Sequence, residues 1–249
     1  MPIGPKRMPF LDHLEEFRKR LVIVVITIAV SSTALYYWSW DMLDIILKPI
    51  LPYIGKLNVF GPFESFTFRF KVALYGALVL TSPILIWQVL AFFLPALKPK
   101  ERRYFVPTFI AGVVLFIAGN AFAYYVILDP AFKWMLGQVA GGSVEVLPDA
   151  SKFLSGVTLL MLGFGLAFEL PVVVFYLLLF DFISYKKLRA SWRVVYVLLM
   201  LVAAIATPDW SPVTMGALFA ALIALYEGSL GLARLVLAKR IAQQKAMGL

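Results

Sequence analysis

Residues 153–180 read FLSGVTLLMLGFGLAFELPVVVFYLLLF, and the run contains a single charged side chain, that of Glu169. A helix needs about 20 apolar residues to cross the hydrocarbon core of a bilayer. The run is longer than that, so it predicts a transmembrane helix over 153–180. Counted from Phe180 at ~1.5 Å per residue, Glu169 lies roughly 16 Å inside the end of this helix.

Glu169 needs a polar or enclosed environment at that depth. An ionised carboxylate that faces lipid costs at least ~2.5–3.5 kcal/mol, so the side chain is expected to face other helices or a wet cavity. Two interpretations stay open. Glu169 is either a structural carboxylate that is hydrogen-bonded inside a helix bundle or a functional site within the membrane, which is the default hypothesis for such residues.

The composition of the whole chain is that of a membrane protein with several spans. Of its 249 residues, 62% are hydrophobic and 15% are charged, and the mean hydropathy is +0.88, which is atypical of a soluble domain. The chain has no cysteine and one histidine, His13. This excludes disulfides, thiol chemistry and clustered metal ligands. The sequence also has no phosphate-binding Gly-rich loop that ends in Lys-Ser/Thr, so direct use of a nucleotide is not expected. No cofactor, metal or catalytic site is therefore predicted.

Apolar runs predict an all-α membrane protein with six transmembrane helices. They lie at about 21–40, 72–94, 106–128, 153–180, 194–207 and 213–232. Residues 1–20 are predicted to be a cytoplasmic segment with a short amphipathic interfacial helix from Phe10, and 233–249 a basic tail. The first apolar run is too long for a signal peptide, so it is expected to be retained. Short surface helices are predicted on the outer side at 42–47, 63–70 and 130–139, and Gly119 with Ala123 predicts close helix packing.

The orientation follows from the distribution of Lys and Arg between the predicted loops. The side that holds both termini carries 17 of the 23 Lys and Arg residues, and the other side carries 6. The positive-inside rule therefore predicts that both termini are cytoplasmic.

Two acids, Glu16 and Glu101, lie within this basic face. A pair of carboxylates can bind guanidinium groups bidentately, so a partner with two arginines would be a suitable ligand. The alternative is as strong, because Glu16 and Arg20 are four residues apart and can form a weak pair on the helix surface. Glu101 can likewise pair with Arg102 or Arg103. Spacing alone does not decide between binding and surface pairing.

A series of short motifs along the chain gives more specific information about its function. In chain order they are HLEEFRKRL at 13–21, SPIL at 82–85 with Gln88, AFFLPAL at 91–97, KERR at 100–103, GNAFAY at 119–124, FGLAFELP at 164–171 and TPD at 207–209. This series resembles TatC, the membrane subunit family of the twin-arginine translocase. The resemblance runs from about residue 9 to 235. The chain departs from the family pattern at Phe17, where Leu is usual, and in the helix after Asp209.

The resemblance implies a concave helical bundle that acts as a receptor for signal peptides with paired arginines on folded cargo proteins. It implies TatA-like and TatB-like single-span subunits as partners, assembly into oligomeric receptor complexes, and export driven by the proton-motive force. The expected location is the prokaryotic cytoplasmic (inner) membrane, with the lipid bilayer as a partner and no nucleic acid.

The resemblance also assigns roles by position. Glu16, Glu101, Arg18 and Phe92 match the signal-peptide-binding surface. Glu169, with Pro171 beside it, matches the intramembrane site at a groove where partner helices or the apolar part of the signal peptide are expected. Pro49 and Asp209 match structural positions on the outer side.

A proton-coupled secondary transporter is the alternative function, with Glu169 as the proton carrier. Only Glu169 and Glu227 offer intramembrane carboxylates for it, and no internal repeat of the kind such transporters show is found. An enzyme is not expected, because a single histidine in a cytoplasmic helix supplies no catalytic arrangement. A transporter should bind a small solute and a receptor should bind a peptide.

Overall fold

The computed structural model describes residues 10–54, 57–59, 61–97, 99, 101–138, 149–207 and 211–238. Within these ranges the chain is almost entirely helical, and its one extended pairing is an isolated bridge between Asn58 and Asp149. The helices are α1 Phe10–Leu35, α2 Ser39–Leu47, α3 Leu51–Ile54, α4 Pro62–Phe93, α5 Phe105–Phe122, α6 Leu128–Gly137, α7 Ala150–Ala167, α8 Leu170–Leu179, α9 Tyr185–Ala190, α10 Trp192–Ala206 and α11 Pro212–Val236. Short 3-10 turns lie at Leu94–Ala96 and Arg102–Tyr104, and a π-helical segment lies at Ala123–Ile127.

The prediction of an all-α membrane protein is confirmed by this architecture. Four helical stretches of the described residues are long and apolar enough to cross a membrane: Phe63–Phe93, Arg102–Gly137, Ala150–Leu179 and Pro212–Val236. Helices α1 and α2 taken together are also long and apolar enough, but they are bent by 89° relative to each other. If they form one span, the described residues contain up to five. Helix α10 has 15 residues, or about 22 Å at 1.5 Å per residue, and is shorter than these four stretches. The number of six spans stays a prediction.

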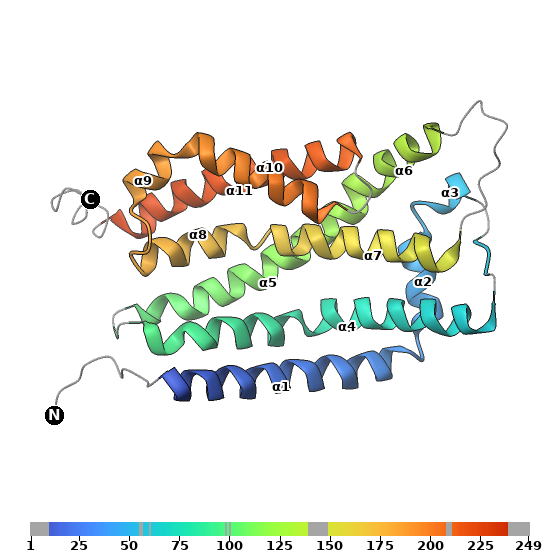
Figure 1. The fold of residues 1–249 in the computed structure, drawn as a ribbon, viewed down its shortest axis with the longest axis horizontal. Helices are drawn as coiled ribbons and strands as arrows, with labels where there is room; N and C mark the ends of the chain where they lie inside the picture. The colour runs from blue at the N-terminus through green and yellow to red at the C-terminus, as the bar shows by residue number, and fades with distance from the viewer. Residues whose placement is uncertain are drawn as a thin grey trace.

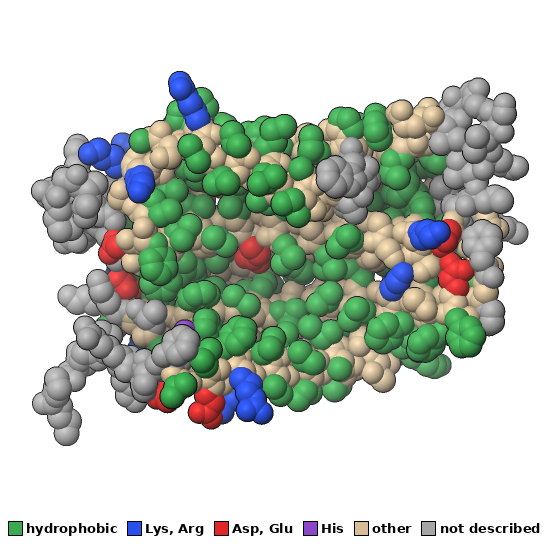
Figure 2. Space-filling model, viewed as in Figure 1, with side chains coloured by type: hydrophobic (Ala, Val, Ile, Leu, Met, Phe, Trp, Pro, Cys, Tyr) green, Lys and Arg blue, Asp and Glu red, His purple; other side chains and the backbone are tan. Residues whose placement is uncertain are grey.

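The long helices run roughly side by side along the longest axis of the molecule (Figure 1). The start of α1, the connection from α4 to α5, helix α9 and the end of α11 lie at one end. Helices α2 and α3 and the end of α6 lie at the other. Figure 2 shows hydrophobic side chains across the middle of one face and charged side chains mainly toward the two ends. The loops that the sequence predicts on the cytoplasmic side therefore share one end of the bundle.

Three predicted boundaries differ from the structure because neighbouring helices are continuous. The predicted interfacial helix and first span form one helix, α1, which has no Gly or Pro and ends at Leu35 before a turn at 36–38. The predicted surface helix at 63–70 is the beginning of α4, which also accommodates Pro83 in its interior. Segments 106–128 and 130–139 are joined through the π-helical segment and α6, in which Pro130 lies in the first turn, where proline is tolerated.

The predicted span 153–180 is broken where a single helix was expected. Helix α7 ends at Ala167, and α8 begins at Leu170 with Pro171 in its first turn. A proline has no N–H to donate to the preceding turn, and its ring crowds that turn. The Glu169 N–H instead donates to the Leu166 carbonyl at 3.1 Å, a tighter turn than an α-helix makes. The break places Glu169 between two helices.

Helices α5 and α7 cross closely at two glycines. A Cβ atom on Gly119 would lie 2.6 Å from the Phe164 carbonyl oxygen, and one on Gly165 would lie 2.3 Å from Asn120 Nδ2. The contact at Gly119 confirms the predicted close packing of this stretch. Asn120 is buried here, accepts a hydrogen bond from the Tyr75 hydroxyl at 3.1 Å and donates one to the Phe116 carbonyl at 2.8 Å.

The end of the bundle that carries α2, α3 and the end of α6 is held together by polar contacts between segments. The Tyr53 hydroxyl of α3 donates to Asp129 at the start of α6. Lys71 of α4 donates to the hydroxyls of Ser151 and Ser155 on α7, each at 2.8 Å. Asp149 caps α7 by accepting from the Lys152 backbone N–H at 3.0 Å, and this bond lowers the pKa of the Asp149 carboxyl.

Candidate functional site

The first polar cluster joins the beginning of α1 to the last third of α4. Arg20 lies one turn after Glu16 and donates to Glu16 Oε1 from Nη2 at 2.5 Å and from Nε at 3.1 Å. The Nη1 group of Arg20 donates to Gln88 Oε1 of α4 at 3.1 Å. Glu16 Oε2 is buried and has no hydrogen-bond partner among the described residues. One oxygen of this carboxylate therefore accepts two hydrogen bonds, and the other accepts none from the described residues.

An aromatic wall stands beside this cluster. The Phe92 ring stacks on His13 with centroids 4.2 Å apart, and it meets the edge of Phe17 at 5.7 Å. Phe17 is 51% exposed although it is apolar. The structure thus brings the predicted site residue Phe92 onto the α1 segment that carries Glu16.

The other two predicted residues of this surface have different environments. Arg18 is exposed on α1. Glu101 precedes the 3-10 turn Arg102–Tyr104 and is only 8% exposed, so its side chain is not an open surface charge. The connection that carries Glu101 lies at the same end of the bundle as the beginning of α1 (Figure 1).

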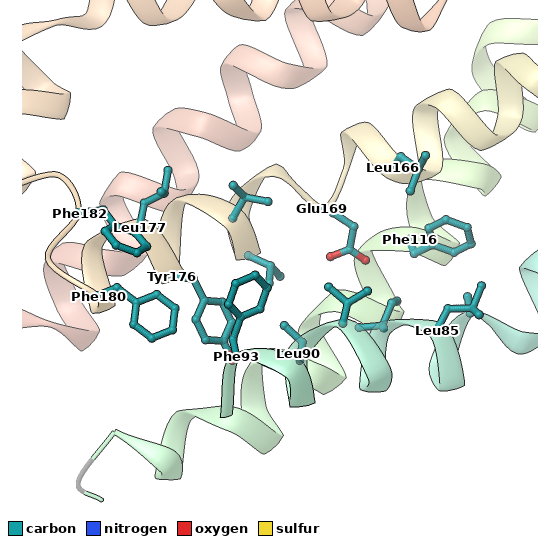
Figure 3. A pocket seen from close by; sticks show the side chains of 15 residues that line it. Leu85, Leu90, Phe93, Phe116, Leu166, Glu169, Tyr176, Leu177, Phe180 and Phe182 are labelled. Atoms are coloured by element: carbon teal, nitrogen blue, oxygen red, sulfur yellow. The ribbon is translucent and has the colours of Figure 1, made fainter. Parts of the chain in front are cut away.

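The second candidate site is a cavity of about 500 Å³ between α4, α5, α7 and α8 (Figure 3). Its walls are almost wholly apolar. They are formed by Ser82, Leu85, Ile86, Val89, Leu90, Phe93, Phe116, Leu166, Glu169, Val172, Val173, Tyr176, Leu177, Phe180 and Phe182. Figure 3 shows the Glu169 carboxylate pointing from the break between α7 and α8 toward Phe116 and Leu85. Glu169 is the only Asp, Glu, Lys, Arg or His among these lining residues.

The Glu169 carboxylate is poorly satisfied inside the protein. Its Oε1 atom is buried with no hydrogen-bond partner among the described residues. Gly112 of α5 lies opposite, where an added Cβ would come within 3.2 Å of Glu169 Oε2, so this glycine makes room for the carboxylate. A buried polar group without a partner is destabilising, and in a native protein it points to a ligand, a strain or a solvent molecule at the site.

Glu227 contrasts with Glu169. Arg189 donates to one oxygen of Glu227, and the Tyr196 hydroxyl donates to the other at 3.0 Å. Both carboxylate oxygens are satisfied between α9, α10 and α11. This arrangement is that of a structural acid.

The remaining predicted residues are two prolines and Asp209. Pro171 opens α8 and causes the break at Glu169. Pro49 is half-buried in the turn between α2 and α3. Asp209 lies outside the described residues.

Sequence reasoning did not assign roles to Gln88, His13 or Gly112. Gln88 stands out in the sequence as an amide within the apolar stretch of α4, and it belongs to one of the motifs quoted above. Gly112 carried no signal, because its importance depends on which helix packs opposite.

Comparisons with known proteins agree with the geometry. A family model described as "Sec-independent protein translocase protein (TatC)" matches residues 12–220. The chain is 31% identical over 240 residues to the Sec-independent protein translocase protein TatC of Carboxydothermus hydrogenoformans, covering 96% of this chain and 98% of that protein. It is 33% identical over 230 residues to the chloroplastic protein TATC of Pisum sativum, covering 92% of this chain and 65% of that one. A crystal structure of the twin-arginine translocase receptor TatC in DDM superposes with a TM-score of 0.75 at 29% identity, covering 88% of this chain and 98% of the other.

Proposed function

Because this chain belongs to the TatC family and is a component of the Sec-independent, twin-arginine protein translocase, we propose that the Glu16 cluster is where it recognises a paired-arginine signal peptide. The half-used carboxylate of Glu16 carries this proposal. Its Oε2 atom is buried and accepts no hydrogen bond from the described residues, and a guanidinium group is the donor that best matches a carboxylate. Phe92 and His13 supply a flat aromatic surface next to it.

Glu101 is the second acid of the proposed site. It belongs to the connection at the same end of the bundle as the start of α1 (Figure 1), and its burial raises the strength of any charge-assisted bond that it makes. Arg18 is exposed on α1 and is proposed to contact the peptide backbone or its acidic groups. The protein acts here by binding, and no bond is made or broken.

The proposed orientation places this end in the cytoplasm of a prokaryotic cell, with the protein in the inner membrane. The excess of Lys and Arg in the segments at this end supports that orientation. The same face then meets cargo before export, which the proton-motive force drives.

The cavity at Glu169 is proposed as the docking site for a single-span partner helix of the TatA or TatB kind. Its apolar walls suit an apolar helix, and Glu169 Oε1, which has no hydrogen-bond partner among the described residues, suits a polar donor on that helix. Proton-coupled transport is the alternative for such a carboxylate. A proton relay needs a second titratable group close to Glu169. The other residues that line the cavity are apolar except Ser82 and Tyr176. Glu227 is not among them, and its carboxylate accepts hydrogen bonds from Arg189 and Tyr196. Docking therefore fits better.

The receptor function is tested by peptide binding to the purified protein in nanodiscs. A signal peptide with its two arginines is compared with the same peptide carrying two lysines, which keeps the charge but removes the guanidinium fork. We expect the arginine peptide to bind at least about tenfold more tightly, since each charge-assisted hydrogen bond contributes roughly 1.5–3 kcal/mol. Equal affinity would contradict the proposed receptor site.

The docking site is tested by the variant Glu169→Ala. We expect the affinity of a partner helix to fall about tenfold, because a charge-assisted bond in the membrane is lost, while signal-peptide binding stays unchanged. The measurement is the cross-linking yield from Leu166→Cys, which is a unique thiol because the chain has no cysteine.

Val173→Ala is the matched control for that experiment. It trims the same cavity wall without removing a charge, so it should lower the yield less. An unchanged yield in Glu169→Ala would instead identify a purely structural carboxylate.

A further inference from the structure

Positive charge is concentrated where α9 meets α10. Lys186, Lys187 and Arg189 lie on α9, and Arg193 lies in the first turn of α10, so four cations fall within eight residues. All four side chains are exposed. Lys and Arg side chains gather at the end of the bundle where α9 lies (Figure 1, Figure 2). Like charges this close together repel one another, and an anion between them relieves that repulsion.

Three of these four cations have no acid partner. Arg189 donates to Glu227 of α11. Lys186, Lys187 and Arg193 form no ion pair with any residue that the structure describes. Cations elsewhere in the described chain that pair with an acid three or four residues away are Lys19, Arg20, Lys133 and Lys152. The junction of α9 and α10 therefore carries three positive charges that the described residues do not compensate.

Helix α9 is held in place, which gives these charges a fixed arrangement. Leu188 is buried and belongs to the hydrophobic core. The Tyr226 hydroxyl of α11 donates to the Leu188 carbonyl at 3.1 Å. The bond from Arg189 to Glu227 joins the same two helices. The exposed lysines are therefore presented by an anchored helix.

Aromatic and apolar side chains border the cluster. Phe182, which precedes α9, and Trp192, which opens α10, are both exposed. The Arg193 guanidinium lies over the Trp192 ring, 5.4 Å from its centroid. Tryptophan is enriched where a membrane meets water. Exposed apolar side chains continue from there along α10 at Val194, Val197 and Leu201. The surface thus passes from cations through an interfacial ring to an apolar helix face.

We propose that the α9–α10 junction binds an anionic phospholipid. Lys186, Lys187 and Arg193 hold the phosphate, and the acyl chains lie along the apolar face of α10. The cluster follows shortly after the apolar stretch Ala150–Leu179, and basic side chains next to a membrane span attract anionic headgroups. A zwitterionic headgroup is a poorer match, because its own cation is repelled by the cluster.

A soluble acidic partner matches only part of this surface. It would use the cations but leave Phe182, Trp192 and the apolar face of α10 without contacts. A phospholipid uses all three parts, since it carries its charge above its acyl chains. The site does not involve the acids proposed to bind the signal peptide, so the inference stands apart from the receptor function.

Native mass spectrometry of the purified full chain in detergent tests the proposal, with phosphatidylglycerol and phosphatidylcholine of the same acyl chains as probes. We expect wild-type protein to retain the anionic lipid at least about tenfold more strongly. The variant Lys186→Gln with Lys187→Gln and Arg193→Gln should bind phosphatidylglycerol roughly 100-fold more weakly, because each cation near an anionic headgroup contributes about fivefold. Lys186→Arg with Lys187→Arg and Arg193→Lys keeps the charge and should retain the lipid.

A matched control separates the site from the net charge of the protein. Lys48→Gln with Lys133→Gln and Lys152→Gln removes three exposed cations from the other end of the bundle. It should change the affinity for phosphatidylglycerol by less than about twofold, since charges far from the headgroup are screened. A monodisperse elution profile verifies that each variant is folded.

Four results would overturn the inference. One is an equal effect on phosphatidylglycerol in the two glutamine variants, because the lipid would then respond only to net charge. Another is equal retention of the two lipids by wild-type protein. Soluble glycerol phosphate that binds as tightly as the lipid would show an anion site in which the apolar face has no part. Displacement of the lipid by a polyglutamate peptide would identify a soluble acidic partner instead.

Discussion

Exchanging Glu16 and Glu101 together for glutamine is expected to weaken the binding of a paired-arginine signal peptide by at least about 100-fold. Each substitution removes a charge-assisted bond of roughly 1.5–3 kcal/mol, so the pair together loses at least about 3 kcal/mol. Glutamine keeps the shape of glutamate and one oxygen acceptor. This is important at Glu101, which is only 8% exposed and would leave a void if it were shortened to alanine.

Isothermal titration in nanodiscs measures this loss, and the thermal midpoint of each variant shows that the fold is kept. Glu15→Gln is the matched control, because Glu15 lies on the same helix and pairs with Lys19 in an exposed contact. We expect it to change the affinity by less than about twofold, as exposed pairs contribute little. Undiminished peptide affinity in the double variant would show that the two acids do not contact the signal peptide.

Gly119→Val is expected to lower the stability of the fold more than any exchange on the surface. A Cβ atom at this position would lie 2.6 Å from the Phe164 carbonyl oxygen and 2.9 Å from the Phe168 Cβ atom. The first of these is backbone and cannot rotate away, so α5 and α7 must separate. Overpacking of this kind costs about 3 kcal/mol, which corresponds to a fall of roughly 6–12 °C in thermal midpoint for a protein of this size.

The thermal midpoint in detergent, followed by intrinsic fluorescence, checks this expectation. Gly216→Val is the control, since Gly216 lies on the exposed side of α11 and an added Cβ would meet nothing within 4 Å. It makes the same chemical change in a helix without a close neighbour. A shift of similar size in both variants would attribute the effect to the lost helix propensity or flexibility of glycine rather than to the crossing.

The sequence predicted the helical segments in their order but not where they join or break. Length and hydropathy identify an apolar run, and α4, α7 and α11 each contain such a run. They do not register a local loss of backbone hydrogen bonding, so the break at Pro171 went unrecognised within 153–180. The continuity of the predicted interfacial helix with the first span, which together form α1, was missed for a different reason. Charged side chains suggested a boundary, although nothing in the backbone requires one.

The candidate sites were predictable to the extent that they depend on local spacing. The pairing of Glu16 with Arg20 follows from their separation by one helical turn, and the depth of Glu169 follows from its position in the run. The partners across the bundle did not follow, because Gln88 meets Arg20 only through the packing of α4 on α1. The position of Gly112 opposite Glu169 could not be predicted for the same reason, since it depends on how α5 packs against the break between α7 and α8. Such contacts arise between helices that are distant in sequence.

Helix α10, with 15 residues and about 22 Å of length, has a consequence for the lipid around it. The hydrocarbon core of a bilayer is about 30 Å thick, so if α10 crosses it, as the sequence predicts, roughly 8 Å of mismatch must be absorbed, at fractions of a kcal/mol per Å. The lipid beside this helix must dip to meet it, and the bent annulus stores elastic energy in proportion to its perimeter. Two such helices that share one dimple have a smaller combined perimeter than two that stand apart. If α10 is a span, the bilayer itself would draw other short-spanning chains toward it, without any contact between side chains.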